Sequence, residues 1–213
     1  MSFATGADLY TSIANHIDRS DLTSVIPDFV ALFEANANAE TTFRTRFNLT
    51  TATLTTTIGT ESIALPSDFQ EANTLINTTV SGGGYAPVPV LTVAALYTTW
   101  PSSTTGEPKN FAAVGSNLIL RPVPDLAYTL KLYYYTKVTA LTSSTSNFLL
   151  QNFPNAYLYG SLVAAEAYLG SDPRIATWGN LYDNFMTKLD TSNERGLYGS
   201  APLKMSFELN NVV

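Results

Sequence analysis

The sequence predicts an α+β fold: a helical bundle formed by the N- and C-terminal helices, an inserted antiparallel β-region, and an extended C-terminal tail. Two observations carry this prediction. Apolar residues recur at helical spacing near both ends of the chain, whereas threonine-rich segments with a period of two fill the middle. The bundle is assigned to residues 1–48 and 140–199, the β-rich region to residues 49–139, and an extended C-terminal arm to residues 200–213.

Composition narrows the classes of function before any motif is considered. The chain has 213 residues, of which 45% are hydrophobic and only 13% charged, with a formal net charge of −6. A reader of nucleic-acid grooves needs clustered Lys and Arg to neutralise phosphates, and the basic residues here are scattered. There are no cysteines, which excludes disulfides and thiolate metal sites. We expect no signal peptide and no membrane span, because no long apolar run is present.

Two helices are predicted in the N-terminal part. The first covers residues 5–18, and its apolar face carries Leu9, Ile13 and Ile17. After a break, the second begins at Ile26, with Pro27 in the first turn, where proline is tolerated. Its stripe is predicted to continue through Phe29, Leu32, Phe33, Asn36, Glu40, Phe43 and Phe47. Arg44 and Arg46 would then lie near its C-terminus, where the helix dipole favours cations.

The middle of the chain is predicted to form strands. Residues 49–65 are rich in Thr on both sides of a glycine, which predicts a β-hairpin. Residues 69–80 contain another strand, and a short helix capped by Thr92 follows. Residues 111–135 predict two strands joined by a tight turn at residues 121–125, because two prolines there remove two backbone donors.

The second strand of this pair alternates strictly. Tyr128, Leu130, Leu132 and Tyr134 form an apolar and aromatic face, and Thr129, Lys131, Tyr133 and Tyr135 form a mixed one. Successive side chains of a strand point to opposite faces of a sheet, so the first set is predicted to be buried. The outward Tyr133 and Tyr135 are candidate residues for contacts between subunits.

The C-terminal part returns to helical spacing. A helix over residues 154–169 is apolar almost all round, which predicts the central position in the bundle. Asp172 as the N-cap and Pro173 in the first turn predict the start of another helix. This helix is expected to end near Gly196. Its one-sided stripe is Ile175, Trp178, Leu181, Tyr182, Phe185 and Leu189.

The last residues again read as a strand. Leu203, Met205, Phe207 and Leu209 alternate with polar residues in the C-terminal arm. A segment of this kind can pair with the edge of another sheet, in its own subunit or in a neighbour. These four residues are therefore candidate interface residues, together with the two outward tyrosines.

No set of residues predicts catalysis, a cofactor or a metal. The single histidine, His16, is expected on the polar side of the first helix, and residues 82–84 lack the Lys-Ser/Thr of a phosphate loop. Carboxylate pairs remain open: Asp68 with Glu71, Asp18 with Asp21, and Asp183 with Asp190. Two functions thus stay as alternatives, a glycan hydrolase that uses two carboxylates, and a carbohydrate-binding module that uses the tyrosines.

The order of several segments resembles the head-to-tail adaptor (connector) proteins of short-tailed bacteriophages. The matching segments are LPSDF at 65–69, TVAALY at 92–97, GEPKNFAAVGSNLIL at 106–120, RPVPD at 121–125 with YTL at 128–130, YYY at 133–135, and residues 147–169 with Trp178 and Tyr182. No single motif is diagnostic, whereas their order and spacing over about residues 50–190 are fairly specific.

This resemblance implies a structural protein of the virion without enzyme activity. Such adaptors form a homo-oligomeric ring, commonly dodecameric, beneath the portal protein. The helical part contacts the portal and adjacent subunits, and the β-part faces the tail nozzle or tail fibre proteins. Genomic DNA passes through the lumen without specific binding, and no membrane is involved. The implied location is the neck of the virion, after assembly in the host cytoplasm.

Overall fold

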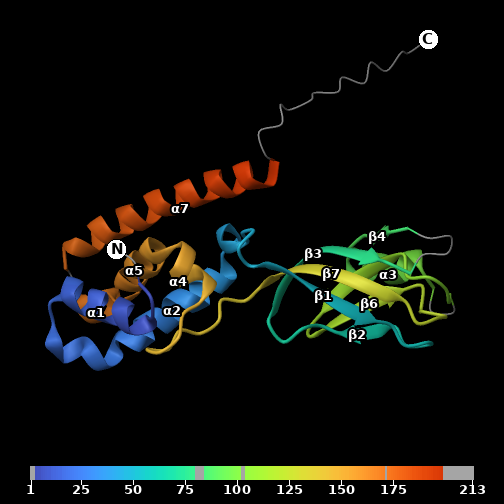
Figure 1. The fold of residues 1–213 in the computed structure, drawn as a ribbon, viewed down its shortest axis with the longest axis horizontal. Helices are drawn as coiled ribbons and strands as arrows, with labels where there is room; N and C mark the ends of the chain where they lie inside the picture. Colours follow the sequence, from blue (N-terminus) through green and yellow to red (C-terminus); the bar gives the residue numbers. More distant parts are fainter. Residues whose placement is uncertain (1–2, 80–83, 102–103, 171, 199–213) are drawn as a thin grey trace, which may run out of the picture.

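A helical part and a β-rich part lie next to each other along the long axis of the molecule (Figure 1). The computed structural model describes residues 3–79, 84–101, 104–170 and 172–198. Helices and antiparallel sheets occupy separate parts of the chain, so the predicted α+β class is confirmed.

The helical part is assembled from both ends of the chain. The N-terminal segment contributes α1 (Gly6–Ile17), the 3₁₀ helix η1 (Ser20–Val25), α2 (Ile26–Ala39) and the 3₁₀ helix η2 (Thr41–Phe43). The C-terminal segment contributes α4 (Phe148–Asn152), α5 (Pro154–Ala164), α6 (Glu166–Leu169) and α7 (Arg174–Tyr198). Helix α5 contacts α1, α2, α4 and α7, which confirms its predicted central position.

The helices begin where the sequence predicts. The backbone N–H of Thr5 donates to the carboxylate of Asp8 at 3.0 Å, which satisfies one of the unpaired donors at the start of α1. Pro27 lies in the first turn of α2. Asp172 accepts from the backbone N–H of Arg174 at 2.9 Å at the start of α7.

Three details of the predicted helices are wrong. Helix α2 ends at Ala39 and does not continue to Phe47, because η2 and the side chain of Arg44 take over its last carbonyl groups. The predicted helix over residues 154–169 breaks at Ala165, where a tighter hydrogen bond forms from the N–H of Tyr168 to the carbonyl of Ala165. Leu32 and Leu181, predicted in the apolar stripes of α2 and α7, are 52% and 41% exposed.

Within the described residues, the strands form two antiparallel sheets. The four-stranded sheet has the order β1 (Leu49–Thr55), β7 (Thr129–Thr136), β3 (Phe69–Asn77) and β4 (Ala86–Val88). The three-stranded sheet has the order β2 (Ser62–Ala64), β6 (Asn117–Arg121) and β5 (Asn110–Val114). Helix α3 (Val93–Thr99) packs on β5, and Thr92 caps it as predicted by accepting from the N–H of Ala95 at 3.3 Å.

In both predicted hairpins the two strands do not pair with each other. In residues 49–65, β1 pairs with β7 and β2 pairs with β6, so the two strands belong to different sheets. In residues 111–135, the hairpin is β5 with β6, which turns at Gly115 with a φ of 58°. The proline-rich residues 121–125 then carry the chain from one sheet to the other, because prolines cannot continue a ladder of N–H donors.

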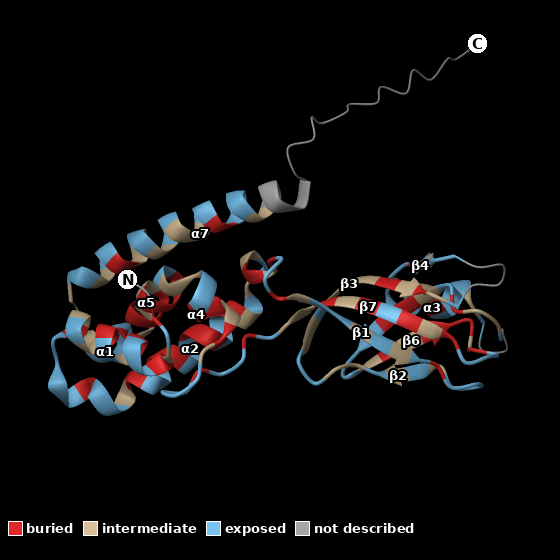
Figure 2. Cartoon of the chain, viewed as in Figure 1, coloured by how far each residue is buried: buried red, intermediate tan, exposed pale blue. Residues whose placement is uncertain are grey.

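Each part has its own apolar core (Figure 2). The sheet core lies between the two sheets and contains the predicted inward face of β7. That face, Tyr128, Leu130, Leu132 and Tyr134, is between 0% and 7% exposed, which confirms the predicted alternation.

Candidate functional site

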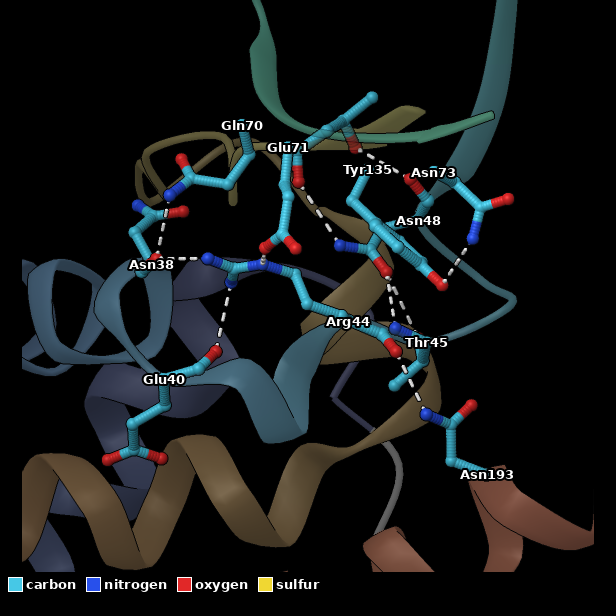
Figure 3. Close-up of polar contacts among 11 residues, drawn as sticks. Asn38, Glu40, Arg44, Thr45, Asn48, Gln70, Glu71, Asn73, Tyr135 and Asn193 are labelled. Carbon is cyan, nitrogen blue, oxygen red and sulfur yellow. Dashed lines mark hydrogen bonds and ion pairs between the residues drawn. The ribbon is translucent and has the colours of Figure 1, made fainter. Parts of the chain in front are cut away.

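A polar cluster lies where the helical part meets the four-stranded sheet (Figure 3). Arg44, which follows η2, donates to the carbonyls of Asn38 at 3.0 Å and Glu40 at 2.9 Å. The last carbonyls of a helix have no partner within the helix, so Arg44 caps α2. The same guanidinium pairs with the carboxylate of Glu71 on β3 at 3.1 Å. One side chain therefore ties the end of the bundle to the sheet.

The chain segment that leads into β1 is fixed in the same cluster. The side-chain oxygen of Asn48 accepts from the N–H of Thr45 at 2.9 Å, and its amide donates to the carbonyl of Thr136 at 3.1 Å. In return, the N–H of Thr136 donates to the carbonyl of Asn48 at 2.9 Å. Helix α7 joins through Asn193, whose amide donates to the carbonyl of Arg44 at 2.8 Å.

Asn38 connects the remaining segments. Its carbonyl accepts from the side chain of Gln70 at 2.9 Å, and its side-chain oxygen accepts from the N–H of Val138 at 2.8 Å. Contacts from α2, α7, β1, β3 and the segment after β7 therefore meet in one place. We call this cluster the junction: Asn38, Glu40, Arg44, Thr45, Asn48, Gln70, Glu71, Thr136, Val138 and Asn193. Hydrogen bonds, more than apolar packing, hold the sheets against the bundle there.

A buried acid fixes the chain that returns from the sheets to the bundle. Glu34 on α2 is 7% exposed and accepts from the hydroxyl of Tyr157 at 2.7 Å and from the N–H of Leu141 at 2.8 Å. Asn147 donates to the same hydroxyl at 2.7 Å. Burial raises the pKa of Glu34 and that of Tyr157. A raised carboxyl pKa is common in active sites, but here both acceptor contacts go to groups that hold the bundle together.

A groove with a volume of about 520 Å³ crosses the helical part between α2, α5 and α7. Gly160, which has no side chain, and the small Ala164 line it, together with the carboxyl-bearing residues Glu40 and Asp183. The hydroxyl of Tyr182 donates to Glu40 at 3.3 Å. Burial raises the pKa of Glu40, and the nearby Asp183 raises it further. The groove is therefore acidic, with apolar walls.

The loops that follow β1 and that precede β4 and β7 lie at the end of the sheets away from the bundle (Figure 1), and each carries a large exposed apolar side chain. Ile58, Tyr85 and Leu126 are 63%, 80% and 58% exposed. Two of the loops are tied together, because the N–H of Gly59 donates to the carbonyl of Pro124 at 2.8 Å. We call these three residues the distal trio. Exposed apolar residues mark a contact surface where they form a contiguous patch, whereas single ones are common on protein surfaces.

Of the six residues predicted to form an interface, the structure describes two. Tyr133 and Tyr135 lie on the outer face of β7 and are half-buried; Asn73 donates to the hydroxyl of Tyr135 at 3.3 Å, and the ammonium of Lys131 lies 5.3 Å from the ring of Tyr133. Their cross-strand neighbours on β1 are Thr51, opposite Tyr133, and Leu49, opposite Tyr135. The other four residues, Leu203, Met205, Phe207 and Leu209, lie outside the described residues.

Three of the six acids considered for hydrolysis make structural contacts. Asp68 accepts from the hydroxyl of Tyr134 at 2.9 Å, and Glu71 pairs with Arg44 in the junction. Asp21 forms an ion pair with Arg19. In the part of the chain that the structure describes, no group of three or more His, Cys, Asp or Glu side chains is placed to hold a metal ion, and no helix is both long and apolar enough to cross a bilayer.

The sequence pointed to part of this arrangement only. Arg44 was expected near the end of α2, and its carbonyl contacts agree with that, but its partner Glu71 is 27 positions away and leaves no local signal. The distal trio was also missed. Ile58 and Leu126 each lie beside turn-forming residues, and that would have been the available signal.

A family model described as SU10 adaptor protein matches residues 4–205 of the chain. The match spans nearly the whole sequence, so the chain belongs to this family, and the resemblance to bacteriophage head-to-tail adaptors is confirmed. A search of curated proteins finds no match. The role that follows from the family is that of an adaptor, a structural protein of a bacteriophage.

Proposed function

We propose that this adaptor forms a homo-oligomeric ring, commonly of twelve copies in such adaptors, that docks beneath the portal protein and links it to the tail in the neck of the virion. The single observation that carries the proposal is the family match over residues 4–205. The two-part fold supports it, because a molecule that bridges two partners needs one surface for each.

We assign the two parts to the two partners. The helical part, residues 1–48 with 140–199, faces the portal and the neighbouring subunits. The β-rich part, residues 49–139, faces the tail nozzle or tail fibre proteins. The distal trio supports this assignment, since it exposes apolar surface at the end of the molecule farthest from the bundle. Tyr133 and Tyr135 and the arm over residues 200–213 serve contacts between subunits.

DNA passes through the lumen of the proposed ring without specific binding. The formal net charge of −6 supports this part of the proposal, because an acidic surface does not attract phosphates. Electrostatic repulsion would let the polyanion slide without being held.

The experiment is to mix the purified protein with the portal protein of the same phage and to image the mixture by electron microscopy. We expect a stoichiometric complex with rotational symmetry and little self-association of the adaptor alone. The proposal fails if the adaptor stays monomeric beside its portal and if virions made without it still hold DNA and tail.

The distal trio offers a matched test of the tail side. Replacing Leu126 with Ser at the exposed tip should leave the portal complex intact and weaken attachment of the tail. The control is Leu181→Ser, which changes a comparably exposed leucine on α7. Equal loss of tails with both variants would contradict the assignment of the β-rich part.

A further inference from the structure

The outer edge of β1 is open. Strand β1 pairs with β7 on one side, with Thr50 opposite Tyr134 and Leu54 opposite Leu130. The N–H of Thr136 donates to the carbonyl of Asn48, and the N–H of Thr56 donates to the carbonyl of Tyr128, so the even-numbered residues of β1 bond to β7. The N–H and carbonyl groups of residues 49, 51, 53 and 55 therefore point outward. Among the described residues, no strand pairs with them.

This edge lacks the usual protection against strand addition. Exposed edges in native proteins carry charges, prolines or bulges, or are very short. Strand β1 has seven residues, LTTATLT, with no charge and no proline. The opposite edge, β4, has three residues including Pro87. In the other sheet, β2 has three residues, and β5 is covered through Phe111, which bonds to the chain at Pro89 and Leu91.

An incompletely covered apolar strip runs along the same side of the molecule. Ala52 and Leu54 of β1, Ile63 of β2 and Leu65 pack against the sheet core but are only half-buried. Their side chains are on the inner face, between the two sheets. A strand added to β1 with apolar residues on that face would cover them.

We propose that residues 203–209 of a neighbouring copy add to β1 as a further antiparallel strand. This segment has seven residues, as β1 does, and its apolar residues, Leu203, Met205, Phe207 and Leu209, occupy every second position. Placed on the inner face, they cover the strip of Ala52, Leu54, Ile63 and Leu65. Lys204, Ser206 and Glu208 then lie opposite Thr55, Thr53 and Thr51, respectively, on the outer face.

The donor is a neighbouring copy because of where α7 leads. Asn193 contacts the carbonyl of Arg44, so the last turns of α7 lie beside the chain that enters β1. A strand of the same copy would start from this end and run parallel to β1. Parallel pairing is slightly weaker per residue, and every strand pair described in these sheets is antiparallel. A segment from another copy can arrive from the far end. The inference rests on the proposed ring, since it needs a second copy at hand.

Cysteine cross-linking tests this arrangement directly, because the natural chain has no cysteine. In the predicted register Thr55 lies opposite Lys204, and Thr51 opposite Glu208. Opposite residues have Cα atoms about 5.5 Å apart, within the range for a disulfide. Two single-cysteine proteins, Thr55→Cys and Lys204→Cys, are mixed, assembled with the portal and oxidised. We expect a disulfide-linked dimer of the two proteins. Thr51→Cys with Glu208→Cys should give the same result.

Two controls separate a strand from a loose contact. Met205→Cys lies on the inner face in this register, so it should cross-link to Thr55→Cys several-fold less than Lys204→Cys does. Thr53→Pro removes an N–H that points away from β7, so the sheet should fold while cross-linking between Thr55→Cys and Lys204→Cys is lost. Thr53→Val is the matched substitution that keeps the N–H and should keep the cross-link.

Each outcome decides the proposal. Cross-links between molecules with the expected alternation support it. A symmetric portal complex without such cross-links overturns the strand addition and leaves the proposed function standing. If Thr55 instead cross-links to Lys204 only within one molecule that carries both cysteines, the neighbouring donor is wrong. If neither a ring nor a cross-link forms, both proposals fail.

Discussion

The two cores of the molecule are built from the chain in different ways. The helical core runs in sequence from Phe3 to Leu189, so residues from both ends of the chain meet in it. The sheet core draws on one continuous segment: its buried residues run from Leu75 to Tyr134, and partly buried residues from Ala52 onward pack against them. The sheets therefore form an insertion that can fold from its own segment. The bundle, in contrast, needs the two ends of the chain to meet across this insertion.

The cores also differ in what joins them. Apolar contacts hold each core together, whereas hydrogen bonds of the junction hold the cores to each other. A hydrogen bond adds modestly to stability but fixes geometry closely. We therefore expect a substitution in one core to destabilise mainly that core. A substitution in the junction should instead change the angle between the bundle and the sheets.

The largest effect is expected in the bundle. Phe33 is 2% exposed, and its ring contacts Tyr157 and Phe43. Phe33→Ala should lower the free energy of unfolding of the bundle by about 3–5 kcal/mol, because a large cavity is left. The measurement is denaturant unfolding followed by tryptophan fluorescence, with Trp178 reporting on the bundle and Trp100 on the β-rich part in single-tryptophan variants. Equal shifts of both reporters would contradict separate cores.

The reciprocal change tests the sheets. Leu130 is 0% exposed and lies near the start of β7. Leu130→Ala should cost about 2–5 kcal/mol, seen by Trp100 and much less by Trp178. Lys131→Ala, at the next position on the outer face, is the control and should change stability by less than about 0.5 kcal/mol.

A smaller loss of stability is expected in the junction, with a larger change of shape. Arg44→Ala removes the contacts to Asn38, Glu40 and Glu71 and should cost about 1.5–3 kcal/mol. Both cores should keep their packing, while the radius of gyration from small-angle X-ray scattering changes as the sheets swing relative to the bundle. Arg46→Ala, two positions on and exposed, should leave the radius of gyration unchanged.

The smallest effect at neutral pH concerns two titrating groups, one in each core. Burial, together with the hydrogen bond to Asp68, raises the pKa of Tyr134 to about 12, from an ordinary 10.0. A raised pKa means that the contribution of Tyr134 is complete below about pH 10 and is lost as pH rises toward 12. The pKa of Glu34 in the bundle is also raised, so its contribution is complete at acid pH and falls as pH rises above its ordinary value of 4.5.

The check is the pH dependence of unfolding in the two variants Tyr134→Phe and Glu34→Gln. Tyr134→Phe should flatten the alkaline loss seen by Trp100, and Glu34→Gln should flatten a slope at acid pH seen by Trp178. The difference in tyrosinate absorbance between the natural chain, which has twelve tyrosines, and Tyr134→Phe gives the pKa of Tyr134 independently. Loss of the alkaline slope in Glu34→Gln instead would show that the two cores are not separable by pH.

The sequence predicted the local features well and the long-range ones poorly. Caps such as Thr92 and Asp172 act within three residues, and the alternation in β7 is a property of one strand, so both are visible in a single segment. The partner of a strand is not visible. Strand β1 pairs with β7 about eighty positions away, and a glycine beside it suggested a hairpin that does not form.

The candidate site follows the same rule. The acceptors of Arg44 at the end of α2 are close in sequence, and its position there was predicted. Glu71 and Asn193 reach it only after the sheet and α7 have packed, so no spacing pattern could indicate them. The exposed distal trio depends on how three loops come together at one end, which is again a result of strand pairing.

The two chain crossings at the junction have a mechanical consequence. Residues 44–48 lead into β1, and residues 136–138 lead out of β7, side by side and joined by hydrogen bonds between Asn48 and Thr136. Both strands continue from there toward the distal loops. A pull on those loops would therefore be carried along two covalent backbones in parallel, and the ladder between them would not be sheared. Bending about the junction meets less resistance. The molecule is therefore stiff when it is pulled along its long axis, and the β-rich part tilts more easily relative to the bundle.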